Sequence, residues 1–263
     1  MSALLQPRMV EKVWGREVLP APFVAPKGKR IGEIWFEPPR ELDALLAKYI
    51  FTSEKLSIQV HPDGPQGKEE CWLVVDAEPN AVLGIGFREP LTSEEIREAA
   101  LDGSIGKLLE WHPVRPGDFF YIPAGTVHAI GGGVSLVEVQ QNRDVTYRLY
   151  DYGRPRELHL EKAVAAAKGG PHNVSLRTHL PERGSMMLLD GPHFRLDRID
   201  GDVPPELAMR YSGPLLVIPL SGEMTVAGTP ATPGQCALAL SADEIRFAAG
   251  GQCLLAQPCA GGA

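Results

Sequence analysis

Short apolar segments separated by glycine and proline make up most of this chain. The clearest are KLSIQVHP, CWLVVD, FFYIPA, SLVEVQQ, LLVIPLSG and EMTVAG. Runs of this length, rich in β-branched and aromatic residues and bounded by turn residues, are typical of β-strands. Many short strands predict a sandwich or barrel, and a jelly-roll barrel leaves few exposed sheet edges. We therefore expect an all-β protein.

Helical patterns are few. Residues 92–103 begin with Thr92 or Ser93 as a helix cap, place glutamates in the first turn and end at Gly103, which predicts a short helix. Residues 104–112 could form a second short helix, and 159–167 a third. The first two would make a small helical insertion at about 91–112 in an otherwise β unit.

The chain divides into two predicted parts. The stretch 169–190 has the weakest pattern, and the strand-like segments beyond it resemble a second β unit. We predict one β-barrel over residues 1–170 and a second, structural β unit over 171–263.

Charge and composition narrow the function. A net charge of -7 argues against a nucleic-acid partner, because phosphate backbones are bound by clustered Lys and Arg. The chain contains no apolar run of about 20 residues, so no membrane partner is expected, and its start lacks a signal-peptide pattern. Four cysteines without a CxxC pair fit a reducing cytoplasm. The sequence does not indicate an oligomeric state.

Two neighbouring segments offer metal ligands. In a strand over 55–61, Ser57, Gln59 and His61 share one face, because side chains alternate. A half-exposed strand would show the same pattern. In GKEECW, Lys68 and Glu70 also share a face, with Glu70 as a carboxylate ligand; a charged turn is the alternative. Neither segment decides the matter alone.

A third segment is more specific. Residues 117–128, GDFFYIPAGTVH, match the second cupin signature G-x5-P-x-G-x2-H, which presents His128 inward. With Gln59, His61 and Glu70 it would supply two imidazoles, a carboxylate and an amide oxygen. Imidazole and carboxylate suit zinc. Because only Glu70 is anionic, the ion would keep a positive charge able to polarise a sugar oxygen.

Further polar residues follow His128. Glu138 would face inward from a strand among apolar neighbours, where burial can raise the pKa of a carboxyl. Arg148 and Arg154 lie in a tyrosine-rich stretch, and a guanidinium group binds phosphate well. Both arginines could equally be paired surface residues.

Several longer segments carry a family resemblance: VEKVWGR, IGEIWF, LLAKYIFTSEKLSIQVHP, GKEECW, PAGTVHAIGGG, EVQQNRDVTYRLYDY and HLEKA. In these, roughly residues 8–168, the chain resembles the type I mannose-6-phosphate isomerases of the cupin superfamily, particularly short bacterial members. The resemblance implies two cupin barrels with a reduced helical insertion. It also implies a zinc-dependent interconversion of mannose 6-phosphate and fructose 6-phosphate through an enediol.

The resemblance also implies roles for individual residues. The family's LS-[IV]-Q-x-H-P, K-x-E and G-T-x-H-A motifs supply the zinc ligands, which here are Gln59, His61, Glu70 and His128. The family's active-site positions correspond to Lys68, Glu138 and Arg148, and its phosphate contacts to Ser57 and Arg154. Arg154 replaces a lysine of longer members.

Two other functions fit the same residues. One is an isomerase or epimerase of another sugar or sugar phosphate. The other is a non-catalytic cupin that binds metal and senses a sugar. Retention of Lys68, Glu138 and Arg148 speaks against a sensor, which would not need acid–base groups.

Overall fold

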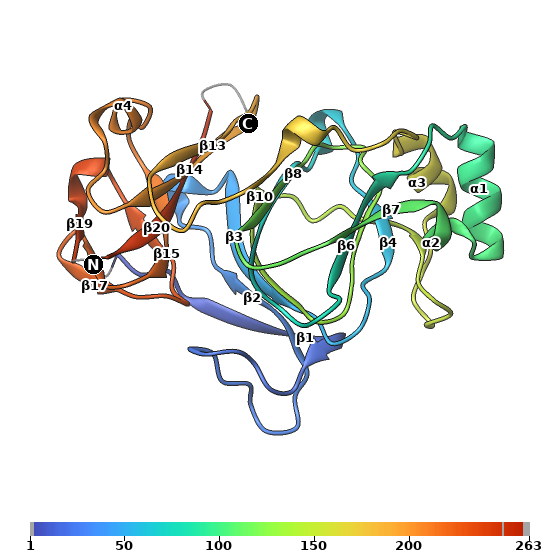
Figure 1. Cartoon of the computed structure of the whole chain (residues 1–263), viewed down its shortest axis with the longest axis horizontal. Helices are drawn as coiled ribbons and strands as arrows, with labels where there is room; N and C mark the ends of the chain where they lie inside the picture. The colour runs from blue at the N-terminus through green and yellow to red at the C-terminus, as the bar shows by residue number, and fades with distance from the viewer. Residues whose placement is uncertain (1–2, 249, 260–263) are drawn as a thin grey trace.

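The computed structural model describes residues 3–248 and 250–259, and most of them lie in or between β-strands (Figure 1). The strands that come first along the chain, which we call the first β unit, are β1 (Pro7–Arg16), β2 (Ile31–Phe36), β3 (Leu45–Phe51), β4 (Ile58–Val60), β5 (Glu70–Ala77), β6 (Val82–Phe87), β7 (Leu109–Pro113), β8 (Asp118–Ile122), β9 (His128–Ile130), β10 (Val134–Gln141), β11 (Tyr147–Tyr150) and β12 (Arg177–His179). They form a seven-stranded sheet, β1-β2-β3-β10-β5-β8-β12, and a five-stranded sheet, β11-β4-β9-β6-β7.

The remaining strands form the second β unit, in orange and red in Figure 1. They are β13 (Met186–Asp190), β14 (Phe194–Asp200), β15 (Leu215–Ser221), β16 (Met224–Val226), β17 (Thr229–Ala231), β18 (Ala237–Ala239), β19 (Ile245–Phe247) and β20 (Gln252–Pro258). Five of them make the sheet β13-β14-β20-β15-β18, and three make β17-β16-β19. The expected all-β architecture is confirmed.

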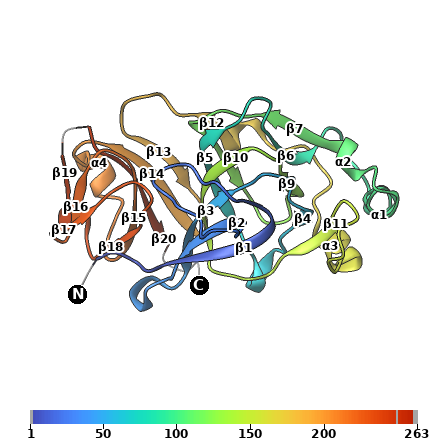
Figure 2. The same ribbon diagram turned by 90° about the horizontal axis from the view of Figure 1, so that it is seen from below.

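The two units are interleaved at their ends. Leu4 pairs with Ala237 of the second unit, and β12, which pairs with β8 within the first unit, lies beyond residue 170 in the sequence. Figure 2 shows β1 starting beside the second unit and running along the edge of the first. One apolar cluster includes Phe51 and Leu73 from the first unit and Phe194 from the second. The predicted domain boundary at residue 170 stays a prediction.

The helices lie mainly at one end of the first unit. They are α1 (Ser93–Asp102), α2 (Ile105–Leu108), α3 (Leu160–Ala166) and, in the second unit, α4 (Pro205–Ala208). Thr92 caps α1 through a reciprocal pair of hydrogen bonds with Glu95, and Gly103 ends it at φ 79°. A residue with a side chain is strained at that φ, which explains the glycine. Among the described residues, none of the helices combines the length and apolar character needed to cross a bilayer.

One helical prediction was too long. Residues 109–112, expected to continue a second helix, belong to strand β7 instead. Trp111 pairs with Gly84 of β6, and a side chain at Gly84 would approach the Trp111 ring within 3.1 Å. The strand therefore gains a flat packing surface for the indole, which outweighs the local helical pattern.

The four cysteines are all free thiols, as expected for a chain without disulfides.

Candidate metal centre and its cavity

Three buried ionisable side chains meet between the two sheets of the first unit. His61 follows β4, Glu70 begins β5, and His128 begins β9; their ligand atoms all lie within 4.8 Å of one another. His61 Nε2 is 3.2 Å from one Glu70 oxygen, and His128 Nε2 is 3.4 Å from the other. Within the described part of the chain, this is the group of acidic, histidine and cysteine side chains able to hold a metal ion.

Backbone carbonyls fix the orientation of both imidazoles. His61 Nδ1 lies 2.7 Å from the Val145 carbonyl, and His128 Nδ1 lies 2.9 Å from the Thr126 carbonyl. A carbonyl only accepts hydrogen bonds, so each Nδ1 carries the proton and each Nε2 is an acceptor, with Lys68 Nζ 3.3 Å from that of His61 and Gln59 Nε2 3.3 Å from that of His128. Burial lowers the pKa of both rings, and the Lys68 ammonium contributes at His61, whose pKa falls to about 4. Neutral imidazoles whose Nε2 atoms face a common point beside Glu70 are in the form that binds metals.

The Glu70 carboxylate is buried without hydrogen-bond partners, since neither of its oxygens accepts a hydrogen bond. Lys68 Nζ is 3.0 Å from one oxygen, in ion-pair contact without hydrogen-bond alignment. Burial opposes ionisation of Glu70, but the neighbouring positive charge, chiefly that of Lys68, outweighs burial and holds the pKa of Glu70 well below its ordinary value. A buried carboxylate without donors is the environment that a bound cation satisfies.

Gln59 lies beside this cluster but turns its nitrogen toward it. Gln59 Nε2 is 3.3 Å from His128 Nε2, and the Ser57 hydroxyl donates to Gln59 Oε1 over 3.1 Å. The two ends of an amide are distinguished only by such contacts. A half-turn of the amide would exchange them, and the Ser57 hydroxyl can donate or accept in either arrangement.

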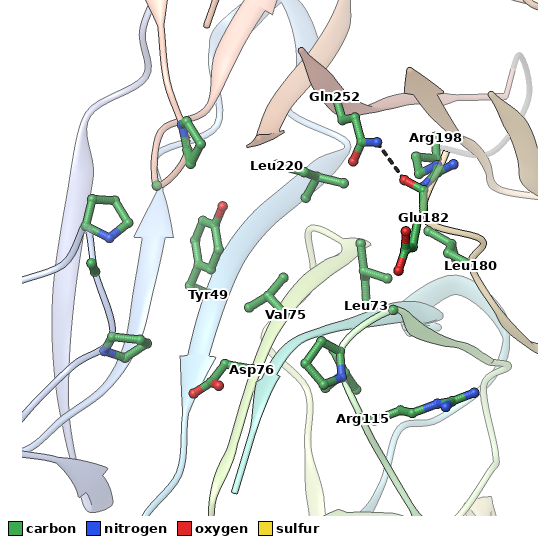
Figure 3. A pocket seen from close by; sticks show the side chains of 18 of the residues that line it. Tyr49, Leu73, Val75, Asp76, Arg115, Leu180, Glu182, Arg198, Leu220 and Gln252 are labelled. Carbon is green, nitrogen blue, oxygen red and sulfur yellow. Dashed lines mark hydrogen bonds between the residues drawn. The ribbon is translucent and has the colours of Figure 1, made fainter. Parts of the chain in front are cut away.

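A cavity of about 340 Å³ lies beside the cluster, and two of the residues that line it, Gln59 and Lys68, contact the cluster. It contains predicted site residues from both sheets: Ser57, Gln59, Lys68, Glu138 and Arg148. The larger cavity of about 530 Å³, between the two units, contains none of them. Figure 3 shows that second space bounded by Tyr49, Leu73, Val75 and Leu220, with Asp76, Arg115 and Glu182 around it. The buried ionic chemistry therefore belongs to the smaller cavity.

Alternating charges cross the sheet floor of the smaller cavity. Their contacts run Lys12–Glu33 (3.4 Å), Lys48–Glu138 (2.8 Å), Lys68–Glu138 (4.0 Å) and Lys68–Glu70 (3.0 Å). Trp72 Nε1 donates to the second Glu138 oxygen over 2.8 Å. The Glu138 carboxylate therefore lies between the ammonium groups of Lys48 and Lys68, beside the candidate metal ligands.

Lys48 was not among the site residues predicted from the sequence. Burial opposes its charge, but Glu138 and Glu33 outweigh burial and raise the pKa of Lys48 above its ordinary value. The signal was present, because Lys48 is the single charged residue in the run LLAKYIF. A lysine is rarely buried unless it is paired.

The arginines separate into different positions. Arg148 lines the cavity, and its Nε is buried without a hydrogen-bond partner. Burial and the nearby Arg156 lower the pKa of Arg148. Arg156 also lines the cavity, braced by Asp151 over 2.6 and 2.7 Å. Arg154 does not line it: its guanidinium bonds the same Asp151 over 2.7 Å and the Lys55 carbonyl over 2.8 Å.

Metal-free protein should lose stability as the pH falls from about 6.5 to about 4. Because the pKa of His61 is lowered to about 4, the unfolded chain binds a proton in this window that the folded chain does not, and stability falls. At 1.36 kcal/mol per pH unit, His61 should lower the free energy of unfolding by roughly 3 kcal/mol across this window. Urea unfolding of chelator-treated protein at several pH values measures this loss. His61→Asn should lose less over the window; an equal loss would contradict the assignment.

Comparison with known proteins gives relatives that share a name. No protein-family model matches the chain. It is 36% identical to a mannose-6-phosphate isomerase of Streptococcus mutans over 197 residues, 68% of this chain and 61% of that protein. Further curated relatives with this name or a qualified form of it, all from Bacillus subtilis, are 38–41% identical, and the chain spans about half of their length.

Solved structures share the fold along the whole chain. The structure of mannose 6-phosphate isomerase from Bacillus subtilis has a TM-score of 0.77 at 24% identity, covering 98% of this chain and 100% of that one. A structure described as mannose 6-phosphate isomerase, holo and zinc bound, has a TM-score of 0.72 at 15% identity, covering 98% and 99%. At these identities the likeness establishes the fold, including the second β unit.

Proposed function

We propose that this chain, which is related in sequence and fold to the type I mannose-6-phosphate isomerases, interconverts mannose 6-phosphate and fructose 6-phosphate with a bound zinc ion. The observation that carries the proposal is the Glu70 carboxylate, buried without hydrogen-bond donors between two neutral imidazoles, beside a cavity that cationic side chains line. A related fold has been solved with zinc bound.

The residues present fit a zinc ion. His61, His128 and Glu70 would bind it through Nε2 atoms and a carboxylate oxygen, and Gln59 would add its amide oxygen after the half-turn described above. Such nitrogen and oxygen donors are the ones zinc prefers. Zinc in this set would act as a Lewis acid on a sugar oxygen.

The substrate phosphate would lie against Arg148 and Arg156. These two guanidinium groups line the same cavity, and the unpartnered Nε of Arg148 is a donor for an anion. Ser57 lines the cavity too, so it stays in the proposed phosphate site. Asp151 holds Arg156 in place through two hydrogen bonds, so little side-chain freedom would be lost on binding.

Lys68 and Glu138 are the proposed acid–base groups. The reaction moves a proton between C1 and C2 of the open-chain sugar through an enediol, so a group that accepts and returns the proton must face these carbons. Lys68 and Glu138 both line the cavity, 4.0 Å apart, and Lys68 contacts the metal cluster. Lys48 would hold the Glu138 carboxylate in position through its 2.8 Å contact.

A substrate panel separates this function from its rivals. Metal-loaded protein should convert mannose 6-phosphate far faster than free mannose, because free mannose lacks the phosphate that Arg148 and Arg156 are proposed to bind. Conversion of another aldose phosphate at a higher kcat/KM would support an isomerase of different specificity. Binding of sugar phosphates without turnover, followed by calorimetry, would support a sensor.

Arg148→Lys should lower kcat/KM by roughly tenfold to several hundredfold, while zinc content and thermal midpoint barely change. Lysine keeps the charge but loses the guanidinium fork, and charge-assisted bonds of this kind contribute about 1.5–3 kcal/mol each, with about 1.4 kcal/mol per decade of rate. Steady-state kinetics measures the change.

Arg154→Lys is the matched control, because Arg154 lies outside the cavity. It should keep kcat/KM near the wild-type value. A larger loss for Arg154→Lys than for Arg148→Lys would return Arg154 to the phosphate site.

A further inference from the structure

Glu69 faces the seam between the two β units, on the other side of the chain from Glu70. Side chains alternate along a strand, so Glu70 points toward the two imidazoles and its neighbours Glu69 and Cys71 point to the opposite face. Cys71 belongs to the apolar cluster that contains Phe194 of the second unit. Glu69 itself is 9% exposed, so this carboxylate is buried at the interface and needs partners there.

Both units contact the Glu69 carboxylate. The Tyr121 hydroxyl of β8 donates to its Oε2, and His193 Nε2, from the turn before β14, lies 4.0 Å from its Oε1. The Glu69 backbone is held as well: its N–H donates to Gln141 Oε1 and its carbonyl accepts from the Gln141 N–H, each over 3.0 Å. Both the side chain and the backbone of Glu69 therefore have specific partners.

His193 is placed by the second unit alone. It lies in a tight turn in which the Gly191 N–H donates to the Phe194 carbonyl over 3.1 Å. The Cys259 N–H, just after β20, donates to the His193 carbonyl over 2.8 Å. Its position therefore depends on the fold of the second unit.

Glu69 stands where a loop meets a strand. The residues before it form a 3-10 turn (Gly64–Gln66). The backbone N–H of Lys68 donates a hydrogen bond to the Pro62 carbonyl over 3.3 Å. Lys68 and Glu70, on either side of Glu69, contact each other over 3.0 Å, and Lys68 also lines the cavity. Their placement depends on how firmly the residue between them is held.

We propose that Glu69 is a positioning residue, held by Tyr121 and His193, that sets Lys68 and Glu70 against the two imidazoles and through which the second unit supports the metal centre. This inference rests on the proposed function. Partners that orient a metal ligand typically change metal affinity or activity by 10–100-fold when mutated. Since Glu69 acts through its neighbours in the chain, we expect the lower end of that range.

The test measures the zinc dissociation constant of the full-length protein by competition with a chromophoric chelator, together with kcat, KM and thermal midpoint. Glu69→Ala should weaken zinc binding about tenfold and lower kcat more than it raises KM. Tyr121→Phe and His193→Ala, which each remove one contact, should weaken zinc binding less. Glu69→Gln, which keeps an acceptor for Tyr121, should recover most of the affinity.

Matched controls are Tyr211→Phe and His179→Ala. The Tyr211 hydroxyl bonds the Leu255 carbonyl within the second unit, and His179 pairs with Asp118 away from the cavity, so both variants should keep wild-type zinc affinity. If Glu69→Ala does not fold, Tyr121→Phe and His193→Ala decide. Wild-type zinc affinity and kcat in Glu69→Ala and Tyr121→Phe, or in Tyr121→Phe and His193→Ala, would overturn this inference alone, whereas a wild-type protein that binds no zinc would overturn the proposed function with it.

Discussion

His61→Ala should remove zinc and activity together while leaving the protein folded. The imidazole supplies one of two Nε2 donors, and its Nδ1 is held only by the Val145 carbonyl, so the surrounding strands do not depend on it. Losing Lewis-acid stabilisation of several kcal/mol, at 1.36 kcal/mol per decade, lowers kcat by about a thousandfold or more. Metal analysis and steady-state kinetics on the same preparation measure both effects.

His179→Ala is the comparison for that variant. His179 pairs with Asp118 and is half-exposed, so its loss should change neither zinc content nor kcat. A His61→Ala protein that retains stoichiometric zinc, or that turns over at a rate near wild type, would remove His61 from the metal centre.

Glu138→Gln should lower kcat by about 10²–10⁴-fold, the usual contribution of a general acid–base group. Glutamine keeps the shape and still accepts from Trp72, but it removes the charge that faces Lys48 and Lys68. Zinc content should persist, because Glu138 does not contact either imidazole. The change in kcat should exceed the change in KM.

The buried Lys48 complicates this variant, and a double variant resolves it. Breaking a buried pair costs up to about 3–5 kcal/mol of stability, and less here because Glu33 stays near Lys48. Lys48→Met with Glu138→Gln removes both charges and should recover stability without recovering turnover. A double variant that recovers turnover would show that Glu138 serves the fold.

The β architecture could be predicted because turn residues and apolar runs are local signals. The capping pattern at Thr92 and Glu95 likewise needs nothing beyond its own turn. Strand β7 was missed because its reason is tertiary: Trp111 packs over Gly84, a residue that lies far away in the sequence. Local pattern alone favoured a helix there.

The candidate site was predictable where ligands share a strand or a fixed motif. Gln59 and His61 alternate on one segment, and His128 ends a signature, so the signature and the family resemblance together suggested that they converge. Arg154 and Arg156 differ by two residues, and the sequence offered no way to tell which one enters the cavity. That choice is made by the bend of the chain around Asp151, whose carboxylate binds both.

Lys48 and Glu69 show the limits of this reasoning more clearly. The pairing of Lys48 with Glu138 requires β3 and β10 to be neighbours, although they are far apart along the chain. Glu69 is the unspecified residue of a K-x-E motif, and its partners come from β8 and from the second unit. Roles that depend on contacts between distant strands required the structure.

Conversion of mannose 6-phosphate to fructose 6-phosphate, measured before chelation, after chelation and after Zn²⁺ is returned, tests the proposed function most directly. A coupled assay on the purified protein follows the reaction in all three states. We predict turnover in the first and third states and a loss of about a thousandfold in the second. Equal turnover after complete metal removal, or no turnover by zinc-loaded protein that binds the sugar phosphate, would contradict a zinc-dependent isomerase.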